Sequence, residues 1–530
     1  MATLDLRSLQ SGAFEGLPVK VPSYDIGSMI EATMKEPLWL HFGAGNIFRI
    51  FIAGIAEDLL NAGLIDRGII AADLFDGQII DDIYKPHDNL TLAAGMRADG
   101  NIDLRVIASV AGSVNGVTND GSLGKIAIAP SLQMMSFTIT EKGYALKGLD
   151  GDYLDIVKSD ITNGPGKCVH AMSRVCALLF ERYKDCGRPV ALVSMDNCSH
   201  NGDKLKDSIL TIASEWHEQG HVGEEFINWI CENVSFPLSM IDKITPRPDS
   251  GVQEKIEALG IDGMAPVTTS KGTYIAPFVN AEIPQYLVVE DLFPQGRPKL
   301  EAAGVYMTDR DTVNKVEKMK VTTCLNPLHT ALAVFGCLTG YNKISDEMKD
   351  PDLLALITRL GYDEAMPVVT DPGIISPSAF ISEVINERLP NPYIPDTPQR
   401  IATDTSLKLP IRFGETIKSY IEDPDLDVAS LECIPLVIAA WIRYLLAVDD
   451  KGDPIELSSD PMLAELQEHL KDVKWNDPDT LGDAADPILR NSLIFATDLI
   501  EAGLGDKIKT LLRGMLGGAG SVRKTLHDHI

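Results

Sequence analysis

The chain has 530 residues, with 47 basic against 76 acidic side chains and a formal net charge of −29. This length predicts more than one domain and a large hydrophobic core, and the charge disfavours nucleic acid and anionic membranes as partners. We see no uninterrupted apolar stretch long enough to cross a bilayer, no signal peptide and no Cys-x-x-Cys pair among the eight cysteines, so we expect a cytoplasmic protein with reduced thiols.

The first predicted elements are a strand, a glycine turn and a helix. An apolar stretch over 38–42 leads into the turn, and a second one over 50–56 follows it. In a dinucleotide-binding unit the first glycine permits the turn, the second lets the backbone approach the pyrophosphate, and the helix N-terminus attracts negative charge. Phe48 replaces the third glycine of this pattern, so a purely structural turn is the alternative.

A second predicted strand, 68–72, ends at Asp73. An acid in this region is expected to bind the adenosine ribose hydroxyls and to favour NAD over NADP. We therefore assign cofactor binding to Gly43, Gly45, Asn46, Ile47, Phe48 and Asp73.

Strands and helices alternate in the rest of the first half. Buried strands are predicted at 107–110, 135–140 and 190–194, and helices at 169–184 and 204–218, a pattern typical of a mostly parallel sheet. Beyond Pro298 the strand signals fade, and helices are predicted within 353–360, 381–389, 431–448, 461–471 and 486–512. The fold class is therefore α/β plus all-α, with a Rossmann-like NAD-binding domain over 1–298 and a mainly α-helical substrate and catalytic domain over 299–530.

A short motif suggests a different class of function. His217-Glu218-Gln219-Gly220-His221 satisfies the His-Glu-x-x-His pattern of zinc peptidases, in which two histidines one helical turn apart bind the metal. Gly220 and Gly223 indicate that the helix ends here, which would separate the two imidazoles. We therefore expect no metal site.

Lys320, Asn326 and His329 lie in one short segment that leads into an apolar stretch over 331–338. Residues three apart in a helix share a face, so Asn326 and His329 are expected to point the same way. A lysine beside them can act as a general acid or base, and the trio could polarise a carbonyl and move a proton without a metal. A helix start with an asparagine cap and a surface lysine is the alternative.

Several further segments point to one family. The chain resembles the polyol-specific long-chain dehydrogenases, which include mannitol 2-dehydrogenase, fructuronate reductase and tagaturonate reductase. The resemblance runs from about residue 38 to the C-terminal helices, and it is carried by the segments 138–144, 194–197 with 201–203, 236–246, 290–293 with 296–298, and 400–408.

The resemblance implies a role for each matching residue. The family lysine that acts as general acid or base corresponds to Lys320, and the glutamate that passes its proton to solvent corresponds to Glu317. Two asparagines that hold the developing alkoxide correspond to Asn197 and Asn326. The histidine that orients substrate oxygens corresponds to His329. Residues of the substrate pocket correspond to Asp242, Arg400 and Lys408, with supporting roles for Asn201, Lys243, Asp404 and Tyr144.

The chain departs from the family between Lys320 and Asn326, where it has one residue more than usual, and Pro327 replaces a glycine. We place the extra residue after the lysine, in a bulge or loop before the helix, with Asn326 as the helix cap. Lys318 is the rival base if the bulge rotates Lys320 away.

The resemblance implies NAD(H)-dependent interconversion of a keto-sugar acid and a sugar acid, here D-fructuronate and D-mannonate. Mannitol 2-dehydrogenase and then tagaturonate reductase are the alternatives, and a sugar-acid sensor without turnover is a further one that the intact Lys/Asn/Asn/His set disfavours. The expected partners are a small sugar acid or polyol, and the chain is expected to be a monomer or small homo-oligomer.

Overall fold

The computed structural model describes residues 2–118, 121–148 and 150–530. The chain forms two compact units, Met1–Arg97 with Asn101–Asn314, and Ala98–Gly100 with Lys315–Ile530. The first unit extends past residue 298 because β17 (Tyr306–Thr308) pairs in parallel with β16 (Tyr286–Glu290). The expected Rossmann-like unit followed by a mainly helical one is confirmed.

A six-stranded parallel sheet forms the centre of the first unit. Its strand order is β7-β4-β3-β8-β9-β10, which is the doubly wound order 3-2-1-4-5-6. In such a sheet ligands bind outside the carboxyl ends of the strands, where the strand order reverses; here that point lies between β3 and β8. The strands are β3 (Trp39–Phe42), β4 (Ile69–Asp73), β7 (Val110–Asn115), β8 (Met134–Phe137), β9 (Val190–Ser194) and β10 (Val234–Ser235).

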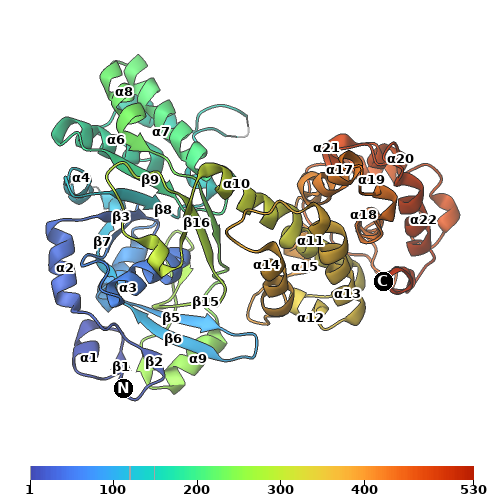
Figure 1. Cartoon of the computed structure of the whole chain (residues 1–530), viewed down its shortest axis with the longest axis horizontal. Coiled ribbons are helices and arrows are strands. Elements are labelled where there is room, and N and C mark those ends of the chain that lie inside the picture. Colours follow the sequence, from blue (N-terminus) through green and yellow to red (C-terminus); the bar gives the residue numbers. More distant parts are fainter. Residues whose placement is uncertain (1, 119–120, 149) are drawn as a thin grey trace. The chain divides into compact units, whose positions relative to one another are not determined.

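Alternate residues of these strands face two hydrophobic cores. Leu40 and Phe42 belong to a core that also contains the apolar faces of α6 (Ala171–Asp185), α7 (Asn201–Glu218) and α8 (Glu224–Asn233). Figure 1 shows these three helices grouped next to β9. Trp39 belongs to the other core, which includes α3 (Ala53–Asn61). Because successive side chains of a strand point to opposite faces, the sheet is covered by helices on both sides.

The prediction of one strand over 107–110 is wrong. This segment contains the end of β6 (Ile102–Ile107) and the first residue of β7. The two strands belong to different sheets, since β6 lies in a four-stranded sheet of order β15-β5-β6-β2. The chain changes sheet at Ser109, whose hydroxyl donates to Ala53 O at 2.6 Å and whose carbonyl accepts from Ile69 N. The remaining strands of this sheet are β2 (Val19–Lys20), β5 (Thr91–Met96) and β15 (Phe278–Glu282), and β11 (Ser239–Asp242) pairs with β16 in a third sheet.

The second unit is built from helices, and every residue from Lys315 to Ile530 is described. The helix predicted within 486–512 is interrupted: α20 (Asp486–Leu489), α21 (Ser492–Phe495) and α22 (Gly505–Met515) are separate. Besides α22, the longer helices are α11 (Asn326–Thr339), α13 (Pro351–Arg359), α17 (Glu415–Glu422), α18 (Cys433–Tyr444) and α23 (Ser521–His529).

One helical run, Arg310–Thr339, has the length and composition of a membrane span, although the sequence was expected to contain no such stretch. Of its most apolar window, 83% is buried inside the protein. The run therefore has the character of a core helix.

Candidate active site

The glycine turn after β3 needs glycine at Gly43. Its φ is +104°, and a Cβ there would lie 2.1 Å from the carbonyl oxygen of Thr138, in the loop after the neighbouring strand β8. The two loops are joined directly, because the Thr138 hydroxyl donates to Gly43 O at 3.1 Å. Gly45 differs, since a Cβ there would meet nothing within 4 Å. The backbone at Gly45 thus borders open space at the reversal point of the sheet.

The helix after the turn begins with the π-helical segment η1 (Phe48–Ile52) and continues into α3. Phe48 is fully buried and stacks on His41 with ring centroids 4.0 Å apart, so only its backbone can contact a cofactor. Burial lowers the pKa of His41 to about 3, and this ring is a neutral packing partner. Asn46 Oδ1 is buried and has no hydrogen-bond partner among the described residues.

Asp73 lies at the end of β4 and is buried. Its Oδ2 accepts from Ala44 N at 3.1 Å, and its Oδ1 accepts from the backbone N–H groups of Phe75 and Asp76 at 2.9 and 2.7 Å. The carboxylate therefore holds the glycine turn against β4. Its assignment to the adenosine ribose stays a prediction.

Asn197 follows β9 and lines a cavity of about 260 Å³ together with Ile47, Thr140, Asp196 and Lys243. This cavity brings together a residue predicted for the cofactor and one predicted for catalysis. Asp196 fixes the wall beside Asn197: its carboxylate accepts from Ile139 N and Thr140 N, both at 2.9 Å. The turn is strained at Thr140, whose φ is +66°.

Tyr144 and Asn201 support this wall from behind, as expected. The Tyr144 hydroxyl donates to Asp196 Oδ2 at 2.6 Å. Asn201 Nδ2 donates to the carbonyls of Asp196 and Ser239, both at 3.0 Å, and so joins the end of β9 to β11. Asp242 is buried at the end of β11.

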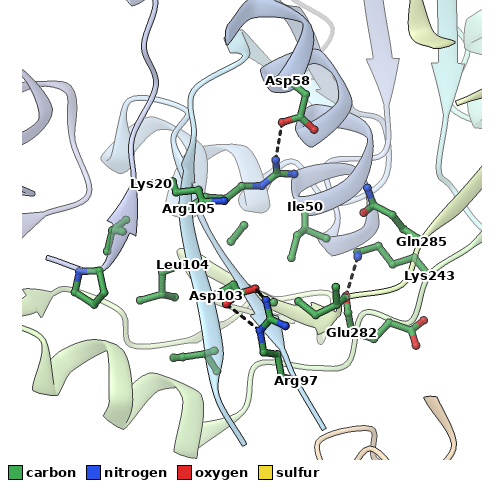
Figure 2. A pocket seen from close by; sticks show the side chains of 16 residues that line it. Lys20, Ile50, Asp58, Arg97, Asp103, Leu104, Arg105, Lys243, Glu282 and Gln285 are labelled. Atoms are coloured by element: carbon green, nitrogen blue, oxygen red, sulfur yellow. Dashed lines mark hydrogen bonds and ion pairs between the residues drawn. The ribbon is translucent and has the colours of Figure 1, made fainter. Parts of the chain in front are cut away.

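A larger cavity of about 710 Å³ lies over β5 and β6 (Figure 2). The two arginines that line it form ion pairs with acidic residues of the same cavity. Arg105 Nη1 lies 2.8 Å from Asp58 Oδ1, and Arg97 Nη2 lies 2.6 Å from Asp103 Oδ2. Lys243, which also lines the smaller cavity, donates to Glu282 O at 2.8 Å.

Lys320 begins the π-helical turn η7 (Lys320–Cys324), which joins α10 (Arg310–Met319) to α11. Its carbonyl accepts from Leu325 N at 3.1 Å, five residues on, and this spacing accommodates one additional residue in the turn. The extra residue therefore forms a π bulge after the lysine, as expected. Lys320 is buried with 5% exposure, whereas Lys318 is exposed.

The prediction that Asn326 caps the helix is wrong. Leu325 is the capping residue, with φ −130° and ψ −60°, and Asn326 is the first helical residue. The bulge ends at Cys324, so the non-helical backbone falls on Leu325. Pro327 takes the next position, where its missing N–H costs nothing. The side chain of Asn326 makes no hydrogen bond within the described part of the chain.

His329 lies one turn along α11, with Nε2 3.3 Å from Asp396 Oδ2. Asp396 is buried and also pairs with Arg400 of α15 (Pro398–Ile401). Burial acts to raise the pKa of Asp396, but His329 and Arg400 together lower it below its usual range. Asp396 was not among the site residues predicted from the sequence. The feature that could have indicated it is its position four residues before Arg400.

Lys408 belongs to α16 (Thr405–Leu409) and donates from Nζ to the backbone carbonyls of Ile401 and Thr403. Burial, then the nearby Arg412, lowers its pKa. Lys320, Asn326, His329, Arg400 and Lys408 all belong to the second unit. Asn197 and Asp242 belong to the first.

The two histidines of the peptidase motif do not share a helical face. α7 ends at Glu218, which places His221 outside it. His217 Nδ1 lies 3.1 Å from Val222 O, and His221 Nε2 lies 3.0 Å from Thr162 O.

Comparison with known proteins agrees with this organisation. Residues 38–302 match the mannitol dehydrogenase Rossmann domain and residues 312–510 match the mannitol dehydrogenase C-terminal domain. A D-mannonate oxidoreductase of Thermotoga maritima is 51% identical over 97% of this chain and 96% of its own length. A D-mannonate oxidoreductase of Escherichia coli is 29% identical over 91% of this chain and 92% of its own.

Two solved structures extend the likeness to the whole fold. A D-sorbitol dehydrogenase has a TM-score of 0.82 at 27% identity, covering 99% of this chain and 100% of its own. The mannitol 2-dehydrogenase of Pseudomonas fluorescens, solved as a ternary complex with NAD and D-mannitol, has a TM-score of 0.71 at 25% identity and 99% coverage of both chains. The chain belongs to the mannitol dehydrogenase family of oxidoreductases.

Proposed function

We propose that this protein is an NAD(H)-dependent oxidoreductase that interconverts D-fructuronate and D-mannonate without a metal. One observation carries the choice of substrate: the chain is 51% identical, over almost its full length, to a protein named D-mannonate oxidoreductase. A sugar acid carries a carboxylate, and the second unit contains basic side chains that suit one, Arg400 and Lys408 among them.

The glycine turn fits a dinucleotide. Gly45 leaves space for a pyrophosphate beside a helix start, where free N–H groups favour phosphate. Asn46 Oδ1, which has no hydrogen-bond partner among the described residues, offers an acceptor for a hydroxyl or N–H group of the cofactor. Gly43, Ile47, the backbone of Phe48 and Asp73 complete the proposed cofactor site.

The residues of the proposed catalytic set have separate tasks. NAD(H), when bound, supplies the hydride exchange with the substrate carbon. Lys320 takes the hydroxyl proton in oxidation and returns it in reduction, and Glu317 passes that proton to solvent. The amides of Asn197 and Asn326 donate to the oxygen on which negative charge develops. His329, oriented by Asp396, and Asp242 hold further substrate oxygens.

Mannitol 2-dehydrogenase is the second candidate. The observation in its favour is the structural match, over 99% of the chain, to an enzyme solved with D-mannitol. Tagaturonate reductase comes third. We also propose that the protein acts in the cytoplasm as a monomer or small homo-oligomer, without nucleic acid or membrane partners.

The test is NADH oxidation by the purified, EDTA-treated protein with D-fructuronate, D-tagaturonate and D-fructose in parallel. We expect rapid turnover of D-fructuronate and much slower turnover of D-tagaturonate and D-fructose. Preference for D-fructose would make the protein a mannitol dehydrogenase, and dependence on added metal would overturn the metal-free mechanism. A preference for NADPH would overturn the assignment of NAD.

A further inference from the structure

The second unit contains an arginine that no acidic group among the described residues neutralises. Arg412 lies on the π-helical turn η11 (Pro410–Gly414), which continues α16. Its guanidinium makes one hydrogen bond, from Nη1 to Thr330 Oγ1 at 2.5 Å, and no carboxylate pairs with it among the described residues. An arginine has five N–H donors, so most of its hydrogen-bonding capacity is unused.

Arg412 is close to the proposed catalytic segment. η11 packs against η7, which begins with Lys320, and against α11. Thr330 follows His329 directly, and the Thr330 hydroxyl that accepts from Arg412 donates to Asn326 O at 3.0 Å. The guanidinium is thus two hydrogen bonds from the backbone of a residue assigned to the reacting oxygen.

The surroundings of Arg412 favour an anion. The Arg412 side chain is partly buried, and burial lowers its pKa to about 10, so the group remains charged at neutral pH. Lys408 is near enough for the positive charge of Arg412 to lower its pKa as well. A buried cation without a partner is costly, and a second cation nearby adds to that cost. An anionic ligand would recover both penalties.

The other two basic residues of the predicted pocket are less free. Arg400 already pairs with Asp396, and its side chain is 62% exposed. Lys408 uses its Nζ on two backbone carbonyls. Only the guanidinium of Arg412 combines partial burial, a permanent charge and several unused donors among these three residues of the described chain. A guanidinium can also present two parallel N–H groups to a carboxylate, which an ammonium cannot.

We infer that Arg412 binds the carboxylate of the sugar-acid substrate and so selects uronates over neutral ketoses, an inference that rests on the function proposed above. D-Fructose carries a hydroxymethyl group where D-fructuronate carries its carboxylate. The ratio of kcat/KM for these two substrates therefore reports the contacts made at that end of the substrate.

The experiment compares wild-type protein with Arg412→Met, which keeps much of the length and apolar stem of the side chain. We expect kcat/KM for D-fructuronate to fall about 10- to 100-fold, the range for a hydrogen bond to a charged group. The loss should appear mainly in KM, and kcat/KM for D-fructose should change less than about 3-fold. An equal loss on both substrates would mark Arg412 as structural and overturn the inference.

Arg400→Met and Arg443→Met are the controls. Arg443 is fully buried and donates to the backbone carbonyls of Val448 and Asp449, so its loss should lower thermal stability and leave the substrate ratio unchanged. Arg400→Met should change the ratio less than Arg412→Met does. Loss of uronate preference in Arg400→Met, with Arg412→Met unchanged, would overturn the inference.

Two further measurements test the inference if the first variant does not fold or if the wild-type protein turns over no uronate. If Arg412→Met does not fold, Arg412→Lys is the deciding variant, because lysine keeps the charge and loses the paired donors. We expect kcat/KM of this variant for D-fructuronate to fall several-fold. An unchanged kcat/KM overturns the inference. If wild-type protein turns over no uronate, the proposed function fails. Arg412 is then tested by binding: D-mannonate, and not D-mannitol, should raise the Tm, and Arg412→Met should abolish that rise. A rise retained in the variant overturns the inference.

Discussion

Glu347, at the end of α12 (Ile344–Glu347), is expected to make the second unit less stable as pH rises. Its side chain is fully buried, and neither carboxylate oxygen has a hydrogen-bond partner in the described part of the chain. Burial, and then the charge of Asp350, raises its pKa from 4.5 to about 9. Glu347→Gln removes the titrating group and keeps its shape.

The magnitude follows from the difference between the folded and unfolded pKa values. Between pH 4.5 and 9 the unfolded chain has released this proton and the folded protein retains it, so the free energy of unfolding falls by about 1.4 kcal/mol per pH unit. From pH 4.5 to 7 this amounts to about 3 kcal/mol. Below pH 4.5 both states are protonated and the penalty disappears.

The assay is calorimetry of wild-type protein and Glu347→Gln at pH 5.5, 7 and 8.5. The Tm of a unit of this size changes by about 2–4 °C for each kcal/mol of stability. The Tm of the variant should therefore lie roughly 6–12 °C above that of wild type at pH 7, and the difference should be larger at pH 8.5. An unpaired amide costs about 1–3 kcal/mol at every pH, which lowers the gain and leaves the trend. Parallel Tm-against-pH curves would refute the reasoning.

A matched control uses the same substitution at another buried glutamate. Glu364 accepts hydrogen bonds from the backbone N–H groups of Glu432, Cys433 and Ile434, at 2.6–2.8 Å, where α18 begins. There the carboxylate interacts favourably with the helix N-terminus. Burial raises the pKa of Glu364, although these N–H groups act to lower it. Glu364→Gln should therefore gain less Tm at neutral pH than Glu347→Gln, because the amide loses part of these hydrogen bonds.

Three further predictions concern the proposed site. Lys320→Ala should lower kcat by about 10²- to 10⁴-fold with NADH binding unchanged, whereas the exposed Lys318→Ala should stay near wild type; the reverse pattern in steady-state kinetics would transfer the role to Lys318. Asn197→Ala and Asn326→Ala should each cost roughly 3 kcal/mol in kcat, and unfolding of both in circular dichroism would favour structural roles instead. Gly43→Ala should abolish NADH binding in fluorescence titration, because its Cβ would lie 2.1 Å from the Thr138 carbonyl; normal affinity would exclude the glycine turn from the cofactor site.

Local patterns in the sequence predicted much of the fold. The strand, glycine turn and helix over 38–56 were predictable because each depends on neighbouring residues: a short apolar stretch for the strand, glycine at the turn, and a second apolar stretch for the helix. The extra residue after Lys320 was recognised by comparison with the family pattern, and a bulge or loop was expected because an additional residue must be accommodated locally. The break at Ser109 was not, because two apolar strands of different sheets look continuous in sequence.

By itself the sequence determined the family, the glycine turn and the candidate set around Lys320, Asn326 and His329, since these are properties of contiguous segments. Only the tertiary structure decided which charges are neutralised. It pairs His329 and Arg400 with Asp396, and it leaves Arg412 with a single threonine and Glu347 with no partner among the described residues. The free energy of a charge depends on burial and on groups distant in sequence, and neither can be read from the residues on either side of it.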